Sequence, residues 1–196
     1  GVSDLGLALN SIGCPDDREK YVQDLKEYLK PHREELCSTC RERLDTNPLR
    51  VLDCKNQSCK AIASEGPRIN EYLCDECRNH FDSVKNYAED LEIDYELDPT
   101  LVRGLDYYTK TVFEVFSSAL GAQDALIGGG RYDGLVELFG GEPTPGVGLA
   151  GGMERLVLVL KETSDIVSRE DGLDVFIATL DRETKRKGFN LLKKLR

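Results

Sequence analysis

The 196-residue sequence lacks any run of about 18 apolar residues, so no segment is expected to span a membrane as a helix. Its first residues, GVSDLGLALNSIG, contain no basic stretch followed by an apolar one, and so do not form a signal peptide. An initiator Met is missing, and the last residues, KRKGFNLLKKLR, stop inside a helical pattern without a Gly or Pro stop signal. We therefore expect a fragment of a longer protein.

The sequence also lacks a surplus of positive charge, because its formal net charge is -10. Proteins that wrap nucleic acid are usually basic, since Lys and Arg contact phosphate, so extensive wrapping is disfavoured. Two groups of basic residues remain, either as local patches or as ordinary solvated helix faces. They are Arg41, Arg43, Arg50, Lys55 and Lys60, and Arg182, Lys185, Arg186, Lys187, Lys193, Lys194 and Arg196.

Hydrophobic spacing predicts an alternation of strands and helices without internal repeats. Asp16 or Asp17 is expected to cap a first helix that ends near Leu29. Residues 37–80 are polar and rich in cysteine, which is typical of a small module held by something other than a large core. Strands are predicted at 5–12, 93–99, 111–117 and 174–180, helices at 79–92 and from Asp181, and a linker at 161–172.

Three segments combine glycine with charged or aromatic side chains. In LVRGLDYYTKTVFE, residues 101–114, an Arg fork that binds anions is followed by one carboxylate and three hydroxyls, although ordinary aromatic packing in a hairpin also fits. GGGRYDGLVELFGG, residues 128–141, predicts a strand, a glycine turn and a short helix; it is neither a P-loop nor GxGxxG. GVGLAGGMERLVL, residues 146–158, predicts a glycine-rich strand that runs into a helix, where Arg155 can reach a phosphate.

Together these segments resemble bacterial-type histidyl-tRNA synthetases over essentially the whole chain. The first resembles that family's histidine-binding motif, the second its glycine-rich element, and the third its form of class II motif 3. TNPLRVLDCK, residues 46–55, resembles part of its insertion domain. The resemblance implies an α+β fold, in which part of a class II antiparallel sheet is flanked by helices and carries a mainly helical, cysteine-rich insertion.

The implied domains are a catalytic strand at 1–13, the insertion at 14–93 and the C-terminal half of the catalytic domain at 94–165. Residues 166–196 would be a linker and the start of an α/β anticodon-binding domain. Motifs 1 and 2 of the family would precede residue 1, so the chain by itself is expected to be inactive.

The resemblance implies a cytoplasmic, homodimeric histidine–tRNA ligase that uses ATP and magnesium to form histidyl-adenylate and then charges tRNA(His). Arg103 would be catalytic, between the histidine carboxylate and the α-phosphate of ATP, and Arg155 would hold the γ-phosphate. The implied histidine site comprises Arg103, Tyr107, Tyr108, Tyr132 and Gly148.

Two other functions fit parts of the pattern. The regulatory subunit of ATP phosphoribosyltransferase, a synthetase paralogue, binds histidine without charging tRNA. It generally lacks the insertion, so residues 14–93 discriminate against it. The second alternative is a zinc-stabilised module that clamps RNA without catalysis.

Six of the seven cysteines fall in the insertion, with the spacing Cys37-x2-Cys40, Cys54-x4-Cys59 and Cys74-x2-Cys77. Two CxxC pairs suit a tetrahedral zinc ion, because each pair supplies two thiolates; free reduced thiols are the alternative. The preferred ligands are Cys37, Cys40, Cys74 and Cys77, and the alternates are Cys54 and Cys59. His80 is a weaker candidate, and Cys14 is expected to be a buried thiol.

Overall fold

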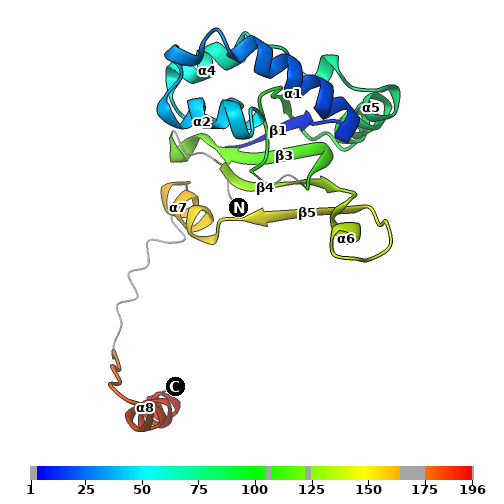
Figure 1. Ribbon diagram of the computed structural model, residues 1–196. Coiled ribbons are helices and arrows are strands. Elements are labelled where there is room, and N and C mark those ends of the chain that lie inside the picture. Colours follow the sequence, from blue (N-terminus) through cyan, green and yellow to red (C-terminus); the bar gives the residue numbers. More distant parts are fainter. Residues whose placement is uncertain (1–3, 105–106, 122–124, 164–174, 196) are drawn as a thin grey trace. The chain divides into compact units, whose positions relative to one another are not determined.

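A computed structural model describes residues 4–104, 107–121, 125–163 and 175–195. The chain divides into two compact units, residues 1–164 and 165–196 (Figure 1). Most of the linker predicted at 161–172 lies outside the described residues.

The first unit contains a mixed five-stranded sheet in the order β2-β1-β3-β4-β5. All neighbouring pairs are antiparallel except β1 with the two-residue β2. The predicted strands at 5–12 and 111–117 are confirmed, whereas that at 93–99 is reduced to β2. The strands are β1 (Leu5–Ser11), β2 (Glu96–Leu97), β3 (Thr109–Ser117), β4 (Ala125–Tyr132) and β5 (Gly146–Gly151).

The glycine run at 128–130 was expected to form a turn and instead lies within β4. Its three residues pair with β3 on one side and with β5 on the other. Backbone pairing on both sides holds the glycines extended, and the chain bends at Asp133 and Gly134 instead. The short helix that follows is α6 (Leu135–Leu138), and β5 runs directly into α7 (Met153–Thr163), as predicted.

The segment between β1 and β3 is helical. Figure 1 shows α1, α2, α4 and α5 gathered beside β1 and β3. The helices are α1 (Pro15–Leu29), α2 (Ser38–Thr46), α3 (Leu49–Leu52), α4 (Gln57–Ser64) and α5 (Asp75–Asp90). Short 3-10 turns occur at η1 (Arg33–Glu35), η2 (Ile69–Glu71) and, after β3, at η3 (Ser118–Leu120).

The first helix begins at Pro15, one residue before Asp16, the earlier of the two expected cap residues. Cys14 is the N-cap residue, and its N–H donates to Asp17 Oδ2 at 3.2 Å, so Asp17 acts from the third helical position. Pro15 suits the first helical position because its missing N–H would have no partner there anyway. Neither Asp16 nor Asp17 is therefore the cap.

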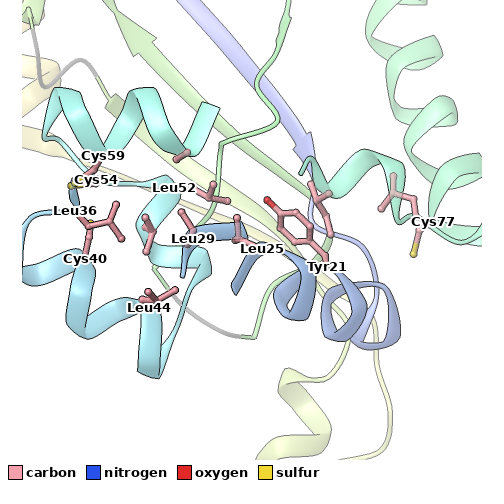
Figure 2. Close-up of a cluster of buried hydrophobic side chains, with 14 residues drawn as sticks. Tyr21, Leu25, Leu29, Leu36, Cys40, Leu44, Leu52, Cys54, Cys59 and Cys77 are labelled. Carbon is pink, nitrogen blue, oxygen red and sulfur yellow. The ribbon is translucent and has the colours of Figure 1, made fainter. Parts of the chain in front are cut away.

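The helical segment has a larger core than its composition suggested. Ten of the fourteen buried residues in one hydrophobic cluster come from residues 37–80, and the others include Tyr21, Leu25 and Leu29 of α1 (Figure 2). Apolar residues that are scattered in a polar sequence meet against one face of α1. The expectation of a module without a large core was wrong, because α1 lies outside the polar stretch and supplies the opposing surface.

The second unit contributes α8 (Arg182–Leu195), which confirms the helix predicted from Asp181. The strand predicted at 174–180 was wrong where the structure describes it. Residues 175–180 form no strand, and Phe176 and Leu180 are 81% and 97% exposed. A short apolar run becomes a strand only where another strand pairs with it, and none among the described residues does so. Lys185, Lys187 and Lys194 are exposed, while the side chains of Arg182, Arg186, Lys193 and Arg196 lie outside the described residues.

Candidate active site and metal centres

One face of the sheet carries small residues at alternate positions of β4 and β5. The ladder places Gly128 opposite Ala150, Gly130 opposite Gly148, and Tyr132 opposite Gly146. Residues opposite each other in an antiparallel pair point to the same face, so apart from Tyr132 these positions present only backbone and the methyl group of Ala150. We call Gly128, Gly130, Gly146, Gly148 and Ala150 the glycine face.

Arg103 lies directly over the glycine face. A Cβ added at Gly128 would overlap its guanidinium group. Arg103 Nη1 donates to Glu114 Oε2 at 2.8 Å, and both side chains are 25% exposed. Arg103 Nε is buried and has no hydrogen-bond partner among the described residues. Glu114 is in the same cross-strand row as Gly128.

Glu114 is a site residue that sequence reasoning overlooked. It stands in the quoted motif, two residues after the buried Val112, so strand alternation puts both on one face of β3. That alternation, together with Arg103 in the same motif, could have identified Glu114 from the sequence. Strand alternation does not indicate that Arg103 is the partner of Glu114, because that depends on the path of residues 101–104 relative to the sheet.

The three tyrosines of the expected histidine site form an aromatic group. The ring centroids of Tyr107 and Tyr108 are 4.7 Å apart, and Tyr132 lies 5.6 Å from the first ring and 6.2 Å from the second. A hydrogen bond with the Tyr108 hydroxyl and burial raise the pKa of Tyr107. Tyr108 is buried, with Cδ1 2.9 Å from a Cβ added at Gly130.

Tyr132 covers the β5 side of the glycine face. A Cβ added at Gly148 would come within 2.7 Å of Tyr132 Oη, and one at Gly146 within 2.5 Å of its ring. Both glycines therefore give the phenol space to lie against the backbone. The structure thus brings Tyr107, Tyr108, Tyr132 and Gly148 together, and their role in binding histidine stays a prediction.

Arg155 stands in the first turn of α7. Its Nη1 donates to the carbonyl oxygen of Ala125, at the start of β4, at 2.6 Å. In this conformation the guanidinium group ties α7 to the sheet. Its assignment to a phosphate remains a prediction.

A polar cavity of about 240 Å³ lies between the sheet and the inserted helices. Its lining includes Glu96, Glu114, Lys55 and Lys60, so two basic residues of the first predicted patch line the same cavity as the partner of Arg103. Other members of that patch make local contacts: Arg41 Nη2 donates to the Glu34 carbonyl oxygen at 2.8 Å, and Arg43 Nη1 to that of Arg50 at 2.8 Å.

The cysteines of the insertion form two clusters instead of the single expected one. The ligand atoms of Cys37, Cys40, Cys54 and Cys59 lie within 4.8 Å of one another, and we call this the four-sulfur cluster. Cys74 and Cys77 instead lie with Cys14 and Asp17, again within 4.8 Å. Figure 2 shows Cys40, Cys54 and Cys59 at one end of the hydrophobic cluster and Cys77 at the other. His80 belongs to neither group of possible ligands.

The four-sulfur cluster already contains N–H···S contacts. The N–H of Cys37 donates to Cys59 Sγ at 3.2 Å, and that of Asn56 to Cys54 Sγ at 3.4 Å. The Cys40 N–H lowers the pKa of the Cys37 thiol to about 7, despite an opposing effect of burial. Burial raises the pKa of Cys40.

Asp17 is the centre of the other cluster, which we call the Cys3Asp cluster. It is only 3% exposed, and burial by itself would raise the pKa of its carboxyl. Hydrogen bonds from the Cys77 thiol and from the Cys14 and Cys74 amides outweigh that effect, so the pKa is lowered. The carboxylate is therefore held in its charged form among three sulfur atoms.

A match to a solved structure defines the class of the fold. The chain resembles the crystal structure of apo S. aureus histidyl-tRNA synthetase, at 39% identity and a TM-score of 0.64, over 100% of this chain and 48% of that one. The mixed sheet with flanking helices is therefore an α+β fold of the class II aminoacyl-tRNA synthetase kind.

The family follows from sequence comparison. Residues 22–156 match the family model described as histidyl-tRNA synthetase. The histidine–tRNA ligases of Caldanaerobacter subterraneus subsp. tengcongensis and Halothermothrix orenii are 50% and 49% identical over 100% and 97% of the chain. The chain belongs to the histidyl-tRNA synthetase family. It spans about half of these relatives, 47% and 45% of their lengths.

No helix among the described residues is long and apolar enough to cross a membrane.

Proposed function

We propose that these residues form the histidine-recognition half of a histidine–tRNA ligase. In the first step, a carboxylate oxygen of histidine attacks the α-phosphorus of ATP, pyrophosphate leaves, and histidyl-adenylate forms. In the second step, a hydroxyl of the 3′-terminal ribose of tRNA(His) attacks the activated carbonyl carbon, and AMP leaves. Magnesium would accompany ATP by binding its phosphate oxygens.

The position of Arg103 is the observation that carries this proposal. Its guanidinium group lies over Gly128, where backbone replaces a side chain, and its buried Nε has no partner among the described residues. A planar cation held in place in this way suits an anion that approaches across the glycine face. Negative charge builds up on phosphoryl oxygens in the first transition state, so a cation fixed beforehand lowers the barrier.

Glu114 would keep the guanidinium in place. The Arg103–Glu114 pair uses Nη1 and leaves the guanidinium plane lying along the glycine face. The carboxylate also partly neutralises the positive charge of Arg103. We therefore expect Glu114 mainly to orient the guanidinium group.

The tyrosines would recognise the imidazole ring of histidine. Tyr107, Tyr108 and Tyr132 offer aromatic surface with hydroxyl groups, which suits a polar heterocycle, and Gly148 leaves room beside Tyr132. Tyr108 is our choice for the hydrogen bond to a ring nitrogen. Arg155 would hold the γ-phosphate, for which its guanidinium group must release or share the Ala125 carbonyl.

Histidine-dependent exchange of pyrophosphate into ATP tests the proposal on a full-length protein that contains this chain. We expect exchange that requires histidine and magnesium. Histidine binding without exchange would instead support the regulatory-subunit alternative. The inserted helices favour the ligase, since relatives that match 100% and 97% of the chain are named histidine–tRNA ligases.

The proposal includes the other features of the family: a homodimer in the cytoplasm, an insertion at 14–93 that approaches tRNA(His), and a linker with the start of an anticodon-binding domain at 166–196. A gel shift with tRNA(His) at several salt concentrations tests the RNA contact, because phosphate contacts weaken as salt rises. Binding that is equal for unrelated tRNA would support only a non-specific basic patch.

We further propose that the four-sulfur cluster holds a structural zinc ion. Zinc–sulfur bonds of about 2.3 Å in a tetrahedron place sulfur atoms about 3.8 Å apart. Cys37 Sγ and Cys54 Sγ are 3.8 Å apart, which is much too far for a disulfide. The zinc would tie α2 to α4 and to the segment that precedes it.

Metal analysis of the purified chain tests this site. We expect Cys59→Ser to remove one equivalent of zinc and Thr39→Ala, an exposed change inside the Cys37-x2-Cys40 loop, to remove none. Equal zinc content in Cys59→Ser and in the unaltered chain would contradict the site.

A further inference from the structure

The Cys3Asp cluster joins the start of the inserted segment to the start of its last helix, α5. Cys14 and Asp17 stand at the start of α1, and Cys74 and Cys77 at the start of α5, about sixty residues later. Cys14 is the N-cap of α1, and Cys74 is the N-cap of α5. Two helix N-termini therefore converge on one group of four possible metal ligands, and the partial positive charge of each favours anionic ligands there.

Asp17 holds the two N-termini together through hydrogen bonds. Its Oδ2 accepts from the Cys14 N–H at 3.2 Å, and its Oδ1 accepts from the Cys74 N–H at 3.0 Å. A buried carboxylate between two amides is fixed in orientation. Its lone pairs that the amides do not use remain available toward the sulfur atoms.

We propose that Cys14, Asp17, Cys74 and Cys77 form a second zinc site, with three sulfur ligands and one oxygen ligand. Tetrahedral zinc needs sulfur–sulfur separations of about 3.8 Å and sulfur–oxygen separations of about 3.5 Å. The four ligand atoms are already within 4.8 Å of one another, so side-chain rotations bring them to bonding distance. Cys74 is exposed, which gives the ion a path from solvent.

This second site differs from the four-sulfur cluster in what it connects. The four-sulfur cluster closes a loop within residues 37–59, whereas the Cys3Asp cluster closes most of the insertion, between residues 14 and 77. A cross-link that closes a long loop removes more freedom from the unfolded chain than one that closes a short loop.

The neighbours of the Cys3Asp cluster extend to the tyrosine segment. Glu76, between Cys74 and Cys77, accepts from Lys110 Nζ at 2.7 Å. Arg18, next to Asp17, donates from Nη1 to the carbonyl oxygen of Tyr108 at 2.9 Å. Loss of the metal would therefore loosen two contacts to the stretch that carries Tyr108, so the site has a positioning role for the aromatic group.

Zinc content of the reduced, purified 196-residue chain tests the second site. We expect two zinc ions per chain, one after Asp17→Asn or Cys14→Ser, and two after Asp75→Asn. Asp75 is a matched control, because it is an exposed carboxylate inside the Cys74-x2-Cys77 loop that belongs to neither cluster. Cys59→Ser should leave one zinc, held by the Cys3Asp cluster.

Cobalt replacement gives a second readout. The thiolate-to-cobalt absorption of the Cys59→Ser chain should reflect three sulfur ligands, and that of the Asp17→Asn chain four. One zinc in the unaltered chain and none after Cys59→Ser would overturn the second site while leaving the first intact. If Asp17→Asn does not fold, as judged by circular dichroism, the comparison of the unaltered chain with Cys59→Ser decides the question.

Discussion

The inserted helices and the glycine face solve opposite packing problems. Around α1, the space is filled by large side chains: Tyr21, Leu25 and Leu29 are at most 1% exposed. On β4 and β5, the space is kept open by residues without side chains, over which Arg103 and Tyr132 lie. Removing atoms should therefore damage the first region, and adding atoms should damage the second.

This contrast separates stability from activity. The insertion is stabilised by burial of apolar surface, and the proposed zinc ions would add cross-links between its helices. The glycine face contributes little buried apolar surface and leaves space for the side chains that lie over it. The predictions below test whether the two regions respond in these different ways, beginning with the largest effect.

Arg103→Ala in the full-length protein should lower the proposed histidine-dependent pyrophosphate exchange by about 100- to 1000-fold, the usual effect of losing one preorganised charge-stabilising group. Arg103→Lys should recover only part of the rate, because an ammonium group lacks the planar fork. Arg68→Ala, at an exposed position outside the site, is the control. Near-normal exchange in Arg103→Ala would remove its catalytic role.

Leu25→Ala should lower the free energy of unfolding by about 2–5 kcal/mol, because a fully buried leucine leaves a cavity in the cluster around α1. Urea denaturation followed by circular dichroism measures the change. Leu91→Ala, at a 70% exposed position, should change stability by less than about 0.5 kcal/mol. Equal effects of the two variants would contradict the description of this core.

Gly128→Ala should reduce pyrophosphate exchange about tenfold or more while leaving the fold intact, because the added methyl group displaces the Arg103 guanidinium. Gly134→Ala makes a matched control, since nothing lies within 4 Å of its added Cβ. If both variants retain full exchange, the close approach of Arg103 to the sheet has no importance for activity.

Tyr108→Phe should raise the KM for histidine by about fivefold, the loss expected for one hydrogen bond, and leave the KM for ATP nearly unchanged. The same kinetic assay separates the two substrates. Equal changes for histidine and ATP would argue against a contact with the imidazole ring and for a general loss of packing.

Arg33→Ala should have the smallest effect, a slight fall in the thermal midpoint at neutral pH. Arg33 donates to both carboxylate oxygens of Asp45, at 3.0 and 2.8 Å, and the bond to Arg33 lowers the pKa of that carboxyl. Because the folded-state pKa is lowered, the stabilisation is present above the pKa of the unfolded state. The difference between the two proteins should vanish as pH falls through the lowered pKa; a difference that persists there would exclude the ion pair as its cause.

Local patterns predicted much of the fold. The period of four in Tyr21, Leu25 and Leu29 predicted α1, and alternation around Val112 predicted β3. The apolar run at 174–180 led to a wrong prediction of a strand, because the same composition fits a strand or an exposed segment. The glycine run at 128–130 led to a wrong prediction of a turn, because glycine occurs both in turns and, for a different reason, in extended strands.

The sequence by itself determined which chemical groups are present: an arginine and three tyrosines near glycine, and cysteines at zinc-knuckle spacing. Only the tertiary structure decided how they group. Spacing along the chain does not determine which cysteine pairs meet in space. In the structure Cys54 and Cys59 lie with Cys37 and Cys40, and Asp17 lies with Cys74 and Cys77. The physical reason is that α1 and α5 begin side by side, a consequence of packing between residues about sixty positions apart.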